Sequence, residues 1–90
     1  MNGMKKLREV IDEIKMSDNE TRLSITYRTY TPDGDDILAG HCFWDIVSHK
    51  LISSDGDSYS LDDELINFEC YVDAFSGKHY LVVWYQSDWQ

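Results

Sequence analysis

Positively charged residues are scarce in this sequence. Eight lysines and arginines stand against 17 aspartates and glutamates in 90 residues, which gives a formal net charge of −9. Proteins that bind DNA or RNA directly usually neutralise phosphates with a basic patch. We therefore expect no direct binding to nucleic acid, and the charge favours a basic protein as partner.

Long apolar runs are missing as well. The segment Tyr80–Tyr85 is one of the longest, far short of the roughly 20 residues that a membrane helix needs. After the basic start, a charged amphipathic segment stands where a signal peptide has a continuous apolar region. The sequence therefore predicts a cytoplasmic protein without a membrane span. In that setting Cys42 and Cys70 are expected to be reduced, buried thiols.

Motifs for catalysis or cofactor binding are also absent. The five glycines are scattered, so no glycine-rich phosphate loop is present. The run Asp55-Gly56-Asp57 resembles the start of a calcium loop, but the glycine is at the second loop position. The twelfth position is Ile66, where calcium needs a bidentate glutamate. We predict that the protein is not an enzyme and uses no cofactor.

Apolar and aromatic residues, by contrast, are plentiful, at 42% and 13% of the chain. This is enough to offset the entropy cost of folding, and 90 residues allow one domain with one core. From Lys5 to Met16, apolar residues recur at the spacing of an amphipathic helix: Leu7, Val10, Ile11 and Ile14.

Strand patterns fill most of the remaining sequence. Thr21 to Thr31 alternates, with one expected inner face: Leu23, Ile25, Tyr27 and Thr29. A Pro-Asp-Gly turn leads to a return strand from Asp36 to Asp45, which is apolar on both faces and therefore expected to be central. Further strands are predicted from Ile66 to Asp73 and from His79 to Gln86.

The predicted fold class is α+β. The N-terminal helix is expected to pack on one face of a roughly four-stranded antiparallel sheet made of two hairpins, within a single domain spanning residues 1–90.

Acidic residues are densest between Leu51 and Gly77, a stretch without lysine or arginine. One interpretation is turn and cap chemistry on a solvated face. The other is a surface that docks on a basic partner, where complementary charge speeds and orients association. Trp89 is the candidate aromatic anchor beside it. The predicted partner-binding residues are Asp55, Asp57, Asp62, Asp63, Glu64, Glu69, Asp73 and Trp89.

Four residues on neighbouring predicted strands suggest zinc as an alternative: His41, Cys42, Cys70 and His79. They lack the usual close spacing of zinc ligands, and His41 and Cys42 point to opposite faces of one strand. A nucleophilic Cys70–His79 pair is disfavoured, because Glu69 and Asp73 place negative charge near the thiol, which opposes formation of the thiolate. The other alternative is a homodimer, formed through the strand from His79 to Gln86 or its neighbour.

Two segments carry a resemblance, Leu51–Asp63 and Leu81–Tyr85. They are similar to segments of small acidic proteins carried by phages and mobile elements of Firmicutes, a population that includes anti-CRISPR inhibitors. The resemblance implies a stoichiometric inhibitor whose basic partner is a CRISPR nuclease such as Cas9. It implies no individual functional residue, because that population shares no catalytic motif.

Overall fold

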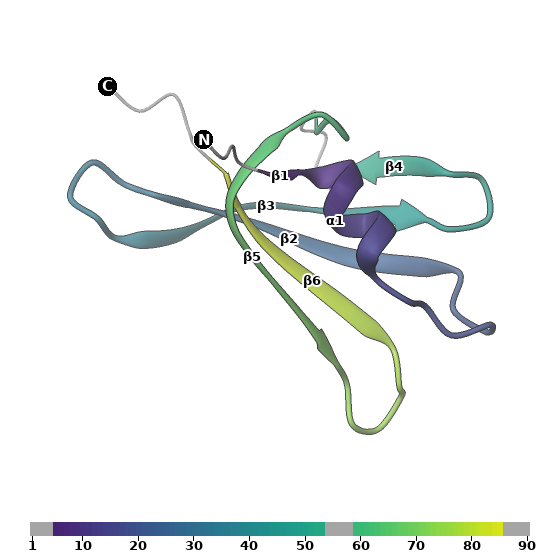
Figure 1. The fold of residues 1–90 in the computed structure, drawn as a ribbon. Helices are drawn as coiled ribbons and strands as arrows, with labels where there is room; N and C mark the ends of the chain where they lie inside the picture. Colours follow the sequence, from purple (N-terminus) through teal and green to yellow (C-terminus); the bar gives the residue numbers. More distant parts are fainter. Residues whose placement is uncertain (1–4, 54–58, 86–90) are drawn as a thin grey trace.

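A computed structural model describes residues 5–53 and 59–85. Within these ranges the chain forms one short helix and one sheet of six strands, as Figure 1 shows. In chain order the elements are β1 (Lys5–Lys6), α1 (Leu7–Glu13), β2 (Arg22–Tyr30), β3 (Asp36–Asp45), β4 (Lys50–Ser53), β5 (Glu64–Val72) and β6 (His79–Tyr85).

The sheet has the strand order β1-β5-β6-β2-β3-β4. Every pair is antiparallel except β2 and β6, which run parallel at the centre. The α+β character is therefore confirmed, but the prediction of four antiparallel strands is wrong. Strands β1 and β4 were not predicted, because segments of two and four residues are too short to show an alternating pattern.

The helix is shorter than the expected span from Lys5 to Met16. Its backbone becomes extended at Ile14, although Ile14 and Met16 still pack against the core. At the other end, the Leu7 and Arg8 amides donate hydrogen bonds to carbonyls of the turn that precedes β5. A helix of seven residues is not stable alone, so these bonds and the burial of its apolar face hold it in place.

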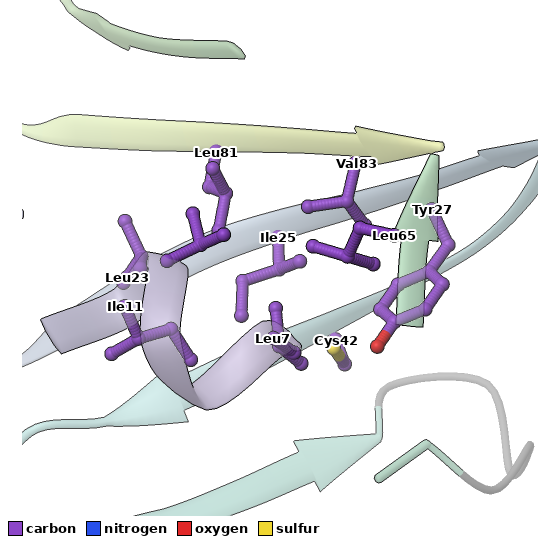
Figure 2. Close-up of a cluster of buried hydrophobic side chains, with 10 residues drawn as sticks. Leu7, Ile11, Leu23, Ile25, Tyr27, Cys42, Leu65, Leu81 and Val83 are labelled. Atoms are coloured by element: carbon purple, nitrogen blue, oxygen red, sulfur yellow. The ribbon is translucent and has the colours of Figure 1, made fainter. Parts of the chain in front are cut away.

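One face of the sheet carries the core, shown in Figure 2. The helix places Leu7 and Ile11 over the central strands, where they meet the alternating inner residues of β2. The predicted inner face of β2 is confirmed, since all its members are buried: Leu23, Ile25, Tyr27 and Thr29. The rest of the core cluster comes from α1, β3, β5 and β6: Val10, Cys42, Leu65, Leu81 and Val83.

Two register shifts change which residues reach the core. The shift between Tyr27 and Arg28 leaves Leu38 63% exposed, although the alternation of β3 placed it beside Cys42. The shift in β5 near Leu65 leaves Ile66 47% exposed and buries Leu65 instead. A bulge inserts one residue into a strand and moves the residues after it to the opposite face.

Candidate functional site

The predicted acidic surface is divided in the structure. Asp62 forms an ion pair with Arg8 at 2.9 Å, and Asp63 accepts hydrogen bonds from the Tyr27 hydroxyl and the Ser60 amide. Asp73 lies beyond the other end of β5, where both the amide and the hydroxyl of Ser76 donate to it. These hydrogen bonds lower the pKa of Asp73. Roughly 30 Å of extended chain separates the two groups, at about 3.3 Å per residue.

Two of the predicted acids have no such internal partner. Among the described residues, none forms a hydrogen bond or an ion pair with the carboxylate of Glu64 or of Glu69, and both residues are exposed on β5. The remaining predictions, Asp55, Asp57 and Trp89, lie outside the described residues.

Strand β5 leaves part of its backbone edge unpaired within the described chain. Its inner side pairs with β6 along its length, but β1 covers only Glu64 and Leu65. We call the remainder, from Ile66 to Val72, the β5 edge. It is rich in exposed apolar side chains, with Tyr71 and Val72 both 54% exposed. The turn that follows adds the fully exposed Phe75.

The four candidate zinc ligands are not brought together. Cys42 is buried under the helix, whereas His41 points to the opposite face of the sheet. No three His, Cys, Asp or Glu side chains within residues 5–53 and 59–85 are arranged to hold a metal ion. The prediction of a buried thiol is confirmed for Cys42 and wrong for Cys70, which is exposed near the end of β5. Partial burial and the Glu20 carboxylate raise the pKa of Cys70, which keeps its thiol protonated.

Glu20 is a buried carboxylate that sequence analysis did not single out. Its oxygens accept four hydrogen bonds, from the amide and hydroxyl of Ser17 and from the amide and Nδ1 of His79. Burial raises the pKa of Glu20, but these bonds outweigh burial and hold the pKa at about 2. A carboxylate that is ionised only accepts, so His79 Nδ1 carries the proton in this contact.

The sheet face opposite the helix carries a second set of side chains, which we call the open face. No described helix or strand packs on it. One row of this face crosses five strands in register, from Tyr71 on β5 through Tyr80, Ser24 and Phe43 to Ile52 on β4. Ser24 is the only small residue of the row, so the row has a gap at its centre.

A pocket of about 340 Å³ lies at this gap, and we call it the Ser24 notch. Phe43 and Tyr80 flank Ser24 on the two neighbouring strands, and the Ser24 hydroxyl lies 2.7 Å from His41 Nε2. The volume falls within the range typical of small-molecule sites. The full lining is Asn19, Glu20, Thr21, Arg22, Ser24, His41, Phe43, Lys78, His79 and Tyr80.

The far end of the open face is closed by polar contacts. Trp84 is 8% exposed and its Nε1 donates to Asp36, which also accepts from Arg28 at 2.7 Å. The Arg28 hydrogen bond lowers the pKa of Asp36, with Trp84 contributing in the same direction. Trp84 is thus buried, on the face of the sheet away from the helix.

Alternation in the sequence identified the outward residues of β2, including Arg22 and Ser24. It gave no indication of the notch, because Tyr80 reaches Ser24 only through the parallel pairing of β2 and β6.

Comparison with known proteins identifies no relative: no protein-family model, curated protein or solved structure matches the chain. The helix found in the described residues is too short to cross a membrane.

Proposed function

We propose that the chain is a non-enzymatic binding module that docks on a basic protein through the acidic side of β5. The observation that carries this proposal is the β5 edge, which is unpaired among the described residues and contains Glu69 but no lysine or arginine. At its β1 end, Glu64 pairs with Lys6, and Lys5 Nζ lies 5.7 Å from the centroid of the Phe68 ring. Between Leu51 and Gly77 the sequence contains no lysine or arginine.

The backbone of the β5 edge suits strand addition. An exposed strand edge presents unpaired amide and carbonyl groups that another chain can pair with. Natural proteins commonly block such edges with lysine, proline or a covering segment. From Ile66 to Val72 the edge has neither lysine nor proline, and Ile66, Tyr71 and Val72 add exposed apolar surface.

Charge then selects the partner. Glu69 forms no ion pair within the described residues, and Glu64 forms none although Lys6 is its strand partner on β1. Asp62 adds a carboxylate whose exposed pair with Arg8 is weak. Opposite charge accelerates encounter and fixes orientation, and this contribution weakens as salt rises. A CRISPR nuclease with a basic nucleic-acid channel is one partner of this kind, as the resemblance to phage and mobile-element proteins suggests.

Site-specific cross-linking in the native host tests the edge. A photoreactive phenylalanine replaces Tyr71 on the β5 edge in one variant and Tyr30, at the far end of β2, in the matched control. Both tyrosines are exposed, 54% and 39%. We expect Tyr71, and not Tyr30, to capture a basic protein. No product at Tyr71, or the same product at both positions, would contradict the proposal.

Charge reversal tests the electrostatic part with the captured protein or with purified Cas9 as the probe. Glu64→Lys/Glu69→Lys is compared with Asp18→Lys/Asp33→Lys, two exposed turn positions. Each double variant changes the net charge by the same four units, from −9 to −5. We expect the first to weaken binding by about tenfold or more at low salt and the second by about threefold or less. Equal losses would show that only net charge matters.

A second copy of the chain is the other candidate partner, because the β5 edge is available for pairing. Strand β6, which the sequence analysis considered for this role, lies between β5 and β2 and has no unpaired edge. Two copies paired through β5 would bring the Glu64 and Glu69 carboxylates of both chains to one interface, which like-charge repulsion opposes. A dimer that persists at low salt in light scattering would favour this alternative.

A further inference from the structure

We infer that the Ser24 notch is a binding site for a small planar aromatic molecule that carries an anionic group. The site lies on the open face, and its lining contains no residue of the β5 edge. Three features point to such a ligand: the spacing of the two aromatic walls, the contacts that hold those walls in place, and the charges at the rim.

The spacing of the walls follows from the register of the sheet. Phe43 and Tyr80 both pair with Ser24, on opposite sides of β2, so two strand spacings separate them. At about 4.8 Å per strand this is about 10 Å between backbones. A planar ring stacked between two others needs about 7 Å from ring to ring, at ordinary carbon contact distances. The serine between them leaves that space unfilled.

Neighbouring side chains contact both aromatic walls and hold them in place. Tyr71 stacks on the outer side of the row against Tyr80, with centroids 5.4 Å apart and planes 15° apart. His41 packs edge-on against Phe43 at 4.7 Å, and the Arg22 guanidinium lies 5.4 Å from the Phe43 centroid. Walls that are already positioned lose little side-chain entropy when a ligand enters.

The floor and the rim set the polarity of the ligand. The Ser24 hydroxyl and His41 Nε2, which form a hydrogen bond with each other at 2.7 Å, make the base polar. Arg22 and Lys78 bring two positive charges to the lining, although the whole chain has a net charge of −9. The one carboxylate of the lining, Glu20, already accepts four hydrogen bonds. Asp45, the strand partner of Arg22, lies outside the lining and accepts from the Val47 and Ser48 amides. These bonds lower the pKa of Asp45, and the charge of Arg22 contributes in the same direction.

An aromatic anion would contact both the aromatic walls and the positively charged rim. Its ring would stack between Phe43 and Tyr80, and its acidic group would lie toward Arg22 and Lys78. A planar cation, such as a guanidinium, would meet the same two positive charges and is disfavoured.

Amide-resolved NMR titration tests this site with defined probes. The anionic probes are benzoate, indole-3-acetate and adenosine monophosphate. Each is matched with an uncharged analogue, here called its neutral form: benzamide, indole-3-acetamide and adenosine. We expect at least one anion to bind with a dissociation constant below about 1 mM, and to shift resonances of residues 19–24, 41–43 and 78–80. Its neutral form should bind at least about threefold more weakly.

Variants separate this site from non-specific binding. Ser24→Leu fills the notch and should weaken binding by tenfold or more, whereas Thr26→Leu, on the same face of β2 but outside the lining, should change it by less than about twofold. Lys78→Gln changes an exposed loop position, so it should not impair folding. It should weaken binding of the anion by about threefold and leave binding of the neutral form unchanged.

Three results would overturn the inference. The first is that no anionic probe shifts these resonances at about 5 mM, a concentration that detects even weak fragments. The second is that neutral forms bind as well as the anions. The third is that Ser24→Leu and Lys78→Gln both bind like the wild type.

Discussion

A Glu20 carboxylate oxygen lies 2.7 Å from His79 Nδ1, although 59 positions separate the two residues in the chain. The other Glu20 oxygen accepts the His79 amide at 2.8 Å. The pair joins the turn before β2 to the first residue of β6, at the end of the sheet where these two parallel strands both begin. Parallel strands cannot share a short hairpin, so this contact supplies a link at the end of the pair that no turn provides.

Acid should destabilise the protein partly through Glu20. Its pKa is about 2 in the folded chain against an ordinary value of 4.5, so folding favours the ionised form. This stabilisation is fully present above pH 4.5 and is lost as the pH falls toward 2. Urea unfolding between pH 7 and pH 2.5 should show Glu20→Gln to be about 1 to 2 kcal/mol less stable at neutral pH, and nearly equal to wild type at the lowest pH. Asp12→Asn, on the exposed side of α1, is the control and should follow the wild type.

Tyr27→Phe should reduce stability without changing the fold. Tyr27 is fully buried and its hydroxyl donates to Asp63 at 3.0 Å. Burial raises the pKa of Tyr27, and the Asp63 carboxylate raises it further, so the phenol stays protonated and donates. Loss of this bond should lower the free energy of unfolding by about 1 to 2 kcal/mol, measured in urea. Tyr71→Phe, at an exposed tyrosine, should change it by less than about 0.5 kcal/mol.

The two cysteines should differ in reactivity toward an alkylating reagent. Cys42 is fully buried and Cys70 is exposed. Mass spectrometry of the native protein treated with iodoacetamide should show one modification, at Cys70, and two after unfolding in urea. Because the pKa of Cys70 is raised, its labelling at pH 7 should be slower than that of a free cysteine peptide. Rapid labelling of Cys42 in the native state would contradict its position beneath α1.

Leu7→Ala should destabilise the protein strongly. The Leu7 side chain is fully buried between α1 and the sheet, and its removal leaves a cavity in the core. We expect a loss of about 2 to 4 kcal/mol in chemical unfolding. Asp12→Ala, on the exposed side of the same helix, should have little effect. An equal loss in the two variants would mean that helix formation, and not packing, dominates the contribution of α1.

Much of the local structure could be predicted from sequence. The bounds of β3 agree with the expected span from Asp36 to Asp45, and those of β2 differ by one residue at each end. Both segments are long, the segment of β2 alternates strongly, and between them lies a Pro-Asp-Gly turn. The helix was correctly located but predicted too long. Apolar residues continue at helical spacing to Ile14, whereas the helical backbone ends at Glu13. The bulge in β5 could not be predicted, since its alternating pattern continues through the shifted register.

The amino-acid sequence by itself determined the surplus of negative charge, the type of most elements and the faces of the long strands. These depend on composition and on periodicity along the chain, which are local properties. Only the tertiary structure decided that β6 lies beside β2, that β5 keeps an edge unpaired within residues 5–53 and 59–85, and that Ser24 stands between Phe43 and Tyr80. Those features depend on which strands are neighbours, and strand order is set by packing between residues far apart in sequence, which leaves no periodic signal in either strand.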